Sequence, residues 1–448
     1  RFAKGETVRS TGEEDVRLRR PLDFLMVADH AENLGVIPRV AAGDESIPES
    51  GQRQRWYEVF AGLRPLSEVL NAETSEDFLV GVRSLNAAKG AWQGDYGIDE
   101  SFRRTVWEEI IASAERHNDP GNFTAFIGYE WSGRANGPMI HRNVLFEGGG
   151  DEATQVLPYS RFDSDDPEDL WAYLDDFESR VGGQVMSIPH NSNLSGGQMF
   201  RLSTDQGQSL TNGYAQTRAR WEPIIEVTQI KGDSETHPLV SPTDEFAGFE
   251  SFGRKATVRP AGKVKPSAKS KKQSGISGKP GAASPETDPI ARERSSYARS
   301  ALKLGLGQKA TLGVNPFKFG MIGSTDSHTG LATADDDNFW GKMGGQEPSA
   351  YRVATQGYFS SSGYAAVWAI ENTRASLFAA MKRREVYATT GPRIAVRFFG
   401  GWDYAADDAF SPELAAVGYR GGVPMGGDLT GAPEGMAPRF LIRVVKDP

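Results

Sequence analysis

The stretch FKFGMIGSTDSHTGL, residues 317–331, changes abruptly from apolar to polar side chains. Its apolar half predicts a buried strand, which ends at the polar segment that contains Asp326 and His328. Residues two apart in an extended backbone point to the same side, so the segment would present this carboxylate and this imidazole together. Such a pair is typical of a metal site, an acid–base pair or a hydrogen-bonded turn.

Apolar runs of strand length recur along the chain and alternate with helical patterns. This alternation predicts an α/β fold with a mostly parallel sheet, either open or closed into a barrel. Shorter alternating pieces after Gly391 predict a separate β-rich unit. Helices are predicted at 99–119, 166–183, 290–307 and 373–386, and strands at 22–28, 123–128, 185–188, 224–230 and 318–323.

Composition restricts the chemistry available to the protein. The chain of 448 residues is 38% hydrophobic and 24% charged, and it contains no apolar stretch near the ~20 residues that a membrane-spanning helix needs. It contains no cysteine, which excludes disulfides, thiolate zinc sites and cysteine nucleophiles. Any metal must therefore be held by nitrogen and oxygen. The chain begins without methionine and stops within a strand-like pattern, so we expect that both ends are cut.

The net charge of −9 is unevenly distributed. The segment 251–285 is rich in Gly, Ser and Pro and holds nine basic side chains and no acidic one, which leaves −18 for the remainder. Low apolar content predicts that its main part, a basic insertion at 254–285, is solvated or disordered. A polyanion-binding arm is the alternative. After Phe252, however, the segment lacks the aromatic residues that nucleic-acid-binding segments interleave with lysines, so no nucleic-acid partner is expected.

Potential metal ligands stand at the ends of four of the five apolar runs. The carboxyl ends of strands meet at one edge of an α/β sheet or barrel, so side chains far apart in sequence would converge there. Each residue alone is more often structural, but their joint placement favours a shared metal site. The candidates are His30, Glu130, His190, Asp326 and His328, with His141 at the start of the strand-like HRNVLF.

Asp29 and His30 are adjacent, so only one of them can face the site from a strand. We expect His30 to be the ligand and Asp29 to support the turn. Imidazole and carboxylate ligands without thiolate suit Zn, Mn or Fe. Two or three such divalent ions, ~3.5–4 Å apart, would clamp the oxygens of a phosphoryl or acyl group and generate hydroxide near neutral pH.

Motifs of other enzyme classes are weak or missing. The sequence has no G-x-S-x-G and no G-x-x-x-x-G-K-[ST], and GLGQKA (305–310) follows a helix where a dinucleotide motif would follow a strand. The loop QIKGDSETHP (229–238) places Lys231 just past a predicted strand. It is either a substrate-binding or acid–base loop at the same edge, or an ordinary charged turn.

Together these motifs resemble the polymerase-and-histidinol-phosphatase (PHP) superfamily of metallohydrolases and, within it, the bacterial branch called domain of unknown function 3604. The resemblance covers nearly the whole chain. It implies a distorted (β/α)7 barrel with two or three metal ions at the carboxyl ends of the strands. It also implies that His30, His141, His190 and His328 are ligands, that Glu130 bridges two ions, and that Asp326 is a second candidate for a bridge. The stretches that carry it are RRPLDFLMVADHAENLG, FIGYEWSG, HRNVLF, SIPHNSN, QIKGDSETH, NPFKFGMIGSTDSH and KRREVYATTGPRI.

The superfamily's first strand carries an H-x-H pair, and this sequence does not contain it. We expect that strand before Arg1. If the strand were truly lost, at least one metal position would be compromised. The resemblance implies a barrel at 1–390 followed by a β-rich segment at 391–448, and it favours a periplasmic or secreted location.

These observations predict a metal-dependent hydrolase that acts on a small-molecule substrate, with phosphate esters as the first class. Glu130 and Asp326 would organise the reaction centre, and Lys231 or Arg142 would supply the cation that holds the non-bridging oxygens. Hydrolysis of a carboxyl ester, lactone or amide at the same ions is the first alternative. A non-catalytic metal- or ligand-binding protein is the second, and metal stoichiometry separates it from the enzymes.

Overall fold

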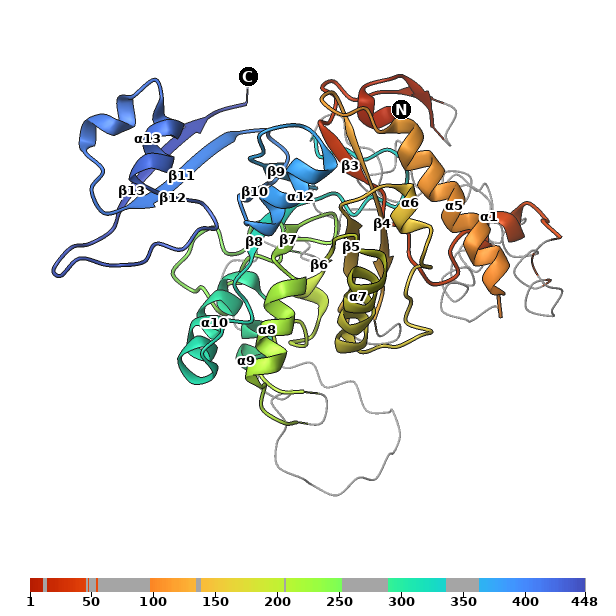
Figure 1. The fold of residues 1–448 in the computed structure, drawn as a ribbon, viewed down its shortest axis with the longest axis horizontal. Coiled ribbons are helices and arrows are strands. Elements are labelled where there is room, and N and C mark those ends of the chain that lie inside the picture. Colours follow the sequence, from red (N-terminus) through yellow and green to blue (C-terminus); the bar gives the residue numbers. More distant parts are fainter. Residues whose placement is uncertain are drawn as a thin grey trace, which may run out of the picture.

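The computed structural model describes residues 1–10, 14–45, 97–133, 138–204, 207–251, 289–335 and 362–447, together with residues 47 and 54. The predicted basic insertion at 254–285 lies outside them. In the described part, helices and strands form a mixed α/β fold with several small sheets (Figure 1). The predicted α/β class is confirmed. Hydrogen bonds between the described strands do not close a barrel, so the (β/α)7 barrel stays a prediction.

A four-stranded sheet in the order β3-β4-β5-β6 carries much of the candidate site. β3 (Phe24–Met26) is parallel to β4 (Thr124–Trp131), whereas β5 (Arg142–Phe146) is antiparallel to β4 and to β6 (Val185–Pro189). The expectation of a mostly parallel sheet is therefore wrong for β5. Residues 132–141, which join β4 to β5, are fewer than the dozen or more that a crossover between parallel neighbours needs.

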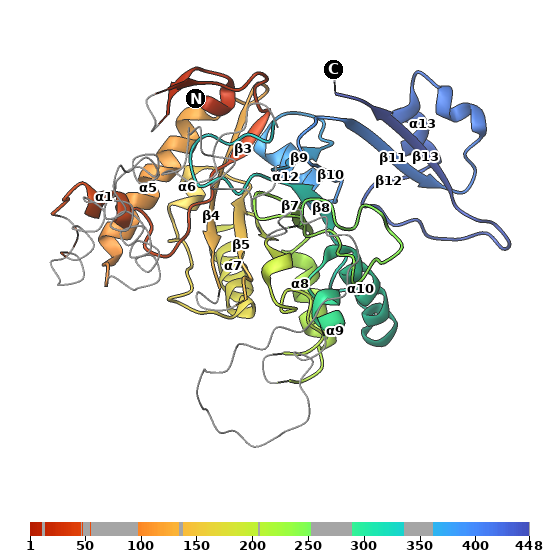
Figure 2. The same cartoon turned by 180° about the vertical axis from the view of Figure 1, so that it is seen from behind.

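Further pairs of strands continue this arrangement. β7 (Ile224–Thr228) and β8 (Gly320–Gly323) are parallel, and β9 (Tyr364–Val367) and β10 (Val386–Thr389) are antiparallel. β7 packs beside β6, and β8 packs beside β10 (Figure 2). All five runs that predict strands therefore contain strands. A short pair, β1 (Val8–Arg9) and β2 (Asp15–Val16), lies near the N-terminus.

Two of the long helices begin at residues whose side chains cap them. Asp99 accepts a hydrogen bond of 2.9 Å from the backbone N–H of Phe102 at the start of α5 (Glu100–His117), and Asp166 caps α7 (Pro167–Val181). The predicted helix at 290–307 is instead two helices, α9 (Pro289–Arg294) and α10 (Ala298–Leu312), because Tyr297 has an extended backbone between them. The pattern at 373–386 contains α12 (Arg374–Lys382) and the start of β10.

The other helices in the described ranges are α1 (Val36–Ala41), α6 (Gly150–Ala153), α8 (Asn212–Trp221) and α13 (Leu414–Gly421). Among the residues that the structure describes, no helix is both long enough and apolar enough to cross a bilayer.

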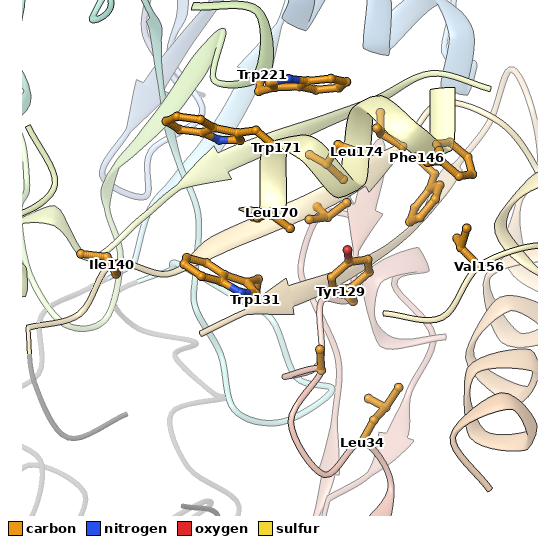
Figure 3. Close-up of a cluster of buried hydrophobic side chains, with 14 of the residues drawn as sticks. Leu34, Tyr129, Trp131, Ile140, Phe146, Val156, Leu170, Trp171, Leu174 and Trp221 are labelled. Carbon is orange, nitrogen blue, oxygen red and sulfur yellow. The ribbon is translucent and has the colours of Figure 1, made fainter. Parts of the chain in front are cut away.

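The largest hydrophobic core lies between the outer face of the four-stranded sheet and its covering helices. Tyr129 and Trp131 of β4 point toward Leu170, Trp171 and Leu174 of α7 (Figure 3). All five side chains are almost completely buried, and burial of each such leucine contributes about 1.5–3 kcal/mol. Since side chains alternate along a strand, the residues between them in β4 face the other side of the sheet.

A smaller antiparallel sheet follows Gly391, with strands in the order β12-β11-β13. Its strands are β11 (Ala395–Gly401), β12 (Gly422–Pro424) and β13 (Arg439–Val445), and α13 packs against them (Figure 1, left). Phe399, Tyr404, Leu414 and Leu441 form a core of their own. The alternating pattern in this part of the sequence therefore does form strands.

Candidate metal site

Three potential ligands meet where β4 and β6 end and the antiparallel β5 begins. Glu130 lies between Tyr129 and Trp131, which both face the outer core, so its side chain points to the inner face. His141 immediately precedes β5, and His190 immediately follows β6. Because β5 runs in the opposite direction to its neighbours, its first residues lie beside the last residues of β4 and β6. Alternation and pairing together therefore bring the three side chains to one place.

His30, Glu130 and His141 form a first group of potential ligands, whose candidate ligand atoms all lie within 4.8 Å of one another. The Nδ1 atom of His141 is 2.7 Å from Oε1 of Glu130, and the Nδ1 atom of His30 is 3.5 Å from the same oxygen. Two backbone hydrogen bonds of 2.8 Å hold His30 in this position. The N–H of Glu130 donates to the carbonyl oxygen of Asp29, and the N–H of Ala31 donates to the carbonyl oxygen of Glu130, so the segment after β3 lies beside the end of β4.

Glu130, His190 and Asp326 form a second group within the same 4.8 Å limit. The Nε2 atom of His190 is 3.2 Å from Oε1 of Glu130. Asp326 comes from the segment after β8 and is half-buried. The two groups share Glu130, so one carboxylate could serve two ion positions.

His190 provides the test of whether these residues suit a metal. Its side chain is 1% exposed, its Nδ1 atom has no hydrogen-bond partner among the described residues, and its Nε2 atom lies 3.2 Å from Oε1 of Glu130. A buried polar atom left without a partner costs about 1–3 kcal/mol, and a metal ion would satisfy a nitrogen lone pair. The donor set of imidazole nitrogens and carboxylate oxygens also suits Zn, Mn or Fe. The residues present therefore fit a divalent ion.

Charges in this cluster shift the ordinary pKa values in opposite directions. Burial opposes the Glu130 anion, but His30, His190 and His141 outweigh it and hold the pKa of Glu130 well below its usual value. Burial also opposes the His190 cation, but Glu130, with Glu226 and Asp326, raises the pKa of His190 to about 9. The metal-free cluster therefore holds a proton on His190 at neutral pH.

Asp326 and His328 do not lie in the extended segment that the sequence predicts. Asp326 has φ = 47°, in the left-handed region, so the rule that residues two apart share one side does not apply. The Nδ1 atom of His328 instead lies 2.9 Å from the backbone oxygen of Asp326. Asp326 belongs to the second ligand group, whereas His328 belongs to neither group. Its role as a ligand stays a prediction.

Lys231 lies at the site, and Arg142 does not. The ammonium of Lys231 forms an ion pair with Asp326. The guanidinium of Arg142 is buried on the outer side of β5, where its Nε donates to Glu222 at 2.9 Å and its charge lies over the Trp131 ring. The expectation that Arg142 holds substrate oxygens is not supported, because strand alternation turns it away from His141.

Glu226 is a site residue that the sequence did not single out. It lies on β7, is 2% exposed, and accepts a hydrogen bond of 2.5 Å from the Ser324 hydroxyl through one oxygen. Its other oxygen, Oε1, is buried and has no hydrogen-bond partner in the described ranges. Burial, with Asp326 nearby, raises the pKa of Glu226 to about 7 against the effect of His190. The signal in the sequence was an acid inside the apolar run IIEVTQI.

Glu32 and Ser132 also lie close to the first group. The Ser132 hydroxyl contacts Nδ1 of His30, and Glu32 Oε2 is 3.8 Å from the same nitrogen. Glu32 also accepts hydrogen bonds from the backbone N–H groups of Ser132 (3.3 Å) and Arg161 (3.0 Å). These contacts fix the orientation of the His30 ring.

One cavity of about 1340 Å³ borders the cluster. It lies between β3 on one side and the segments of β8 and β9 on the other, and its lining includes the apolar residues Phe126, Leu145 and Ile188. The cluster is therefore open to this cavity. The acidic residues and histidines that line it beside the cluster are Asp29, His30, Glu130, Glu226, Asp326 and His328.

These features define a class of protein: a mixed α/β fold with a buried histidine–carboxylate cluster that could hold a metal. Comparison with protein families identifies one family for the whole chain. Over residues 1–448 the chain matches the family model described as "Protein of unknown function (DUF3604)", and it belongs to that family. No curated protein and no solved structure gave a significant match.

Proposed function

We propose that this chain is a metal-dependent hydrolase and that phosphate esters are its substrates. The observation that carries the proposal is the sharing of Glu130 by two groups of potential ligands, one with His30 and His141 and one with His190 and Asp326. Two divalent ions held side by side would supply Lewis-acid and water-activating chemistry to a displacement at phosphorus. The family resemblance in the sequence supports the same reading, and with it we propose a PHP-type barrel.

The chain's own residues would position the ions and the substrate. Glu130 and Asp326 place negative charge between the histidines, which would hold cations close together. Asp29 supports this arrangement through its backbone oxygen, which accepts the N–H of Glu130.

Lys231 is a cation at the second ligand group, where it forms an ion pair with Asp326. Its pKa is raised above the ordinary value because Asp326, Glu130 and Glu226 outweigh the effect of burial, so it carries a charge at neutral pH. An ammonium beside the ions would stabilise negative charge that develops on non-bridging phosphate oxygens. Phosphate esters are therefore favoured over neutral esters and amides, which need less cationic stabilisation.

The test is a metal-reconstitution assay on the full chain. Protein stripped with a chelator would be reloaded separately with Zn²⁺, Mn²⁺ and Fe²⁺. It would then be offered aryl phosphate mono-, di- and triesters alongside carboxyl esters and lactones. We expect metal-dependent hydrolysis of at least one phosphate ester, and its loss in Glu130→Gln.

The matched control is Glu109→Gln, which makes the same chemical change at an exposed ion pair with Arg39. It should retain wild-type activity. Hydrolysis of carboxyl esters or lactones alone would move the assignment to the first alternative. Metal binding without turnover on any of these substrates would favour a non-catalytic metal-binding protein.

A further inference from the structure

Lys231 forms an ion pair with a carboxylate that a metal ion at the second ligand group would also need. Its ammonium pairs with the carboxylate of Asp326, and both side chains are only 12% exposed. Asp326 is also a member of the second ligand group, with Glu130 and His190. One carboxylate in such a confined position cannot give its full charge to an ammonium and to a divalent ion at the same time.

The backbone holds Lys231 in this place. Its N–H donates to Oε1 of Gln229 at 2.7 Å, and its carbonyl oxygen accepts from Nδ2 of Asn193 at 3.0 Å. Gln229 in turn donates to Asn191 at 2.5 Å. The backbone is fixed by these contacts, so only the flexible side chain can move its ammonium away from Asp326.

We propose that Lys231 determines the occupancy of the second ion position: its ammonium neutralises Asp326 when that position is empty, and an ion enters only by displacing it. The inference rests on the proposed metal site. The first position, at His30, Glu130 and His141, does not involve Asp326 and is free of this competition. The two positions should therefore fill in order, the first tightly and the second weakly.

Glu226 offers the displaced ammonium a second acceptor. Its Oε1 atom is buried without a hydrogen-bond partner in the part of the chain that the structure describes, and its charge and that of Lys231 influence each other. A Lys231 side chain that moves from Asp326 to Glu226 keeps a counter-ion throughout, which avoids the cost of an unpaired buried charge.

The experiment measures metal binding directly, by titration calorimetry with Zn²⁺ and by metal analysis of the dialysed full-length chain. Wild type should bind one ion tightly and a second more weakly. In Lys231→Met the second ion should bind at least about tenfold more tightly, because the fraction of molecules with a free Asp326 rises. The affinity for the first ion should change by less than about threefold, a difference of well under 1 kcal/mol.

Two further lysine variants make the result specific. Lys231→Arg keeps the positive charge, so the second ion should still bind weakly. This variant separates the effect of charge from any loss of stability in Lys231→Met. Lys318→Met removes a lysine that pairs with Asp428 away from the cluster, and it should match wild type. Glu226→Gln should weaken the second ion several-fold, since the displaced ammonium loses its acceptor.

The possible outcomes separate this inference from the proposed function. A second ion that binds no more tightly in Lys231→Met than in wild type would overturn the inference while leaving the metal site intact. An unchanged second affinity in Glu226→Gln would overturn the role of Glu226. Absence of any ion in wild type would overturn both the inference and the proposed function.

Discussion

The Nε2 atom of His190 lies 3.2 Å from Oε1 of Glu130, the same oxygen that lies 2.7 Å from Nδ1 of His141. His141 precedes β5 and His190 follows β6, so both histidines face this carboxylate from the same side of β4. The Nδ1 atom of His190 has no hydrogen-bond partner in the described ranges. Glu130 is therefore common to the two groups of potential ligands, whereas each histidine belongs to one of them.

Substitution of single ligands should therefore give different metal stoichiometries. Glu130→Gln should lose both ions, because Glu130 belongs to both groups. His141→Asn should lose only the first ion, and His190→Asn only the second. Each loss should exceed the ~10–100-fold change in affinity that removal of a supporting partner causes. Metal analysis after dialysis measures this, and equal losses in all three variants would contradict a shared carboxylate.

Metal uptake should release protons. The pKa of His190 is raised to about 9 in the metal-free protein, and a metal ligand must be deprotonated, so binding at His190 near pH 7.5 should release about one proton. Calorimetry in buffers with different ionisation enthalpies measures the number. The release should disappear in His190→Gln, and a wild-type value of zero would show that His190 is not protonated beforehand.

The stability of the metal-free protein should fall as the pH rises. A raised pKa means that the folded state binds the proton more tightly, so the stability that His190 contributes is fully present below about pH 6.5 and is lost through about pH 9. Glu226, raised from 4.5 to about 7, adds a loss between those two values. Melting temperatures from pH 5 to 9 test the trend. Glu226→Gln should flatten the lower part of the curve and His190→Gln the upper part.

Arg142 should matter for stability and not for the binding of substrate. Arg142 and Arg218 each donate to Glu222 at 2.9 Å, and all three side chains are almost completely buried. Removing Arg142 keeps the Glu222–Arg218 ion pair but leaves the buried Oε1 atom of Glu222 without its donor, so Arg142→Met should cost about 1–3 kcal/mol. Denaturant titration measures the loss. If Arg142→Met had a normal free energy of unfolding and a strongly raised KM, Arg142 would instead be a substrate-binding residue.

Asp326 combines an electrostatic and a conformational requirement. Asp326→Asn should lose the second ion but keep a residue type that tolerates the left-handed backbone. Asp326→Ala should lose the same ion and about 1 kcal/mol more stability, because alanine is strained there. Ser327→Ala removes a hydroxyl that donates to the Thr329 carbonyl at 3.1 Å and accepts from the Thr329 N–H at 3.4 Å, and it should be mild. Metal content and melting temperature of the three variants test this order.

Much of this arrangement could be predicted from the sequence because it follows from short-range rules. Apolar runs identify strands, and a period of two places Glu130 opposite the outward-facing Tyr129 and Trp131. The position of His30 beside Glu130 follows from the convergence of strand ends. Pairing was harder to predict, since HRNVLF reads equally well as a parallel or an antiparallel strand.

The remaining differences come from features that strand patterns do not encode. Strand alternation alone could have predicted that Arg142 points away from the site. Its ion-pair partner could not be predicted in this way, because Glu222 is 80 residues distant in sequence. The left-handed backbone at Asp326 depends on the turn after β8, which leaves no periodic signal. Glu226 was overlooked because an acid inside an apolar run is identified as part of a site only when its neighbours in space are known.

The most direct test of the Glu130-centred site is anomalous diffraction from crystals of the full-length protein equilibrated with millimolar Zn²⁺ or Mn²⁺. We predict one anomalous peak in contact with Glu130, His30 and His141, and a second in contact with Glu130, His190 and Asp326. The second peak should weaken first as the metal concentration falls. Full metal occupancy with no peak touching Glu130 would contradict the site and the hydrolase assignment that rests on it.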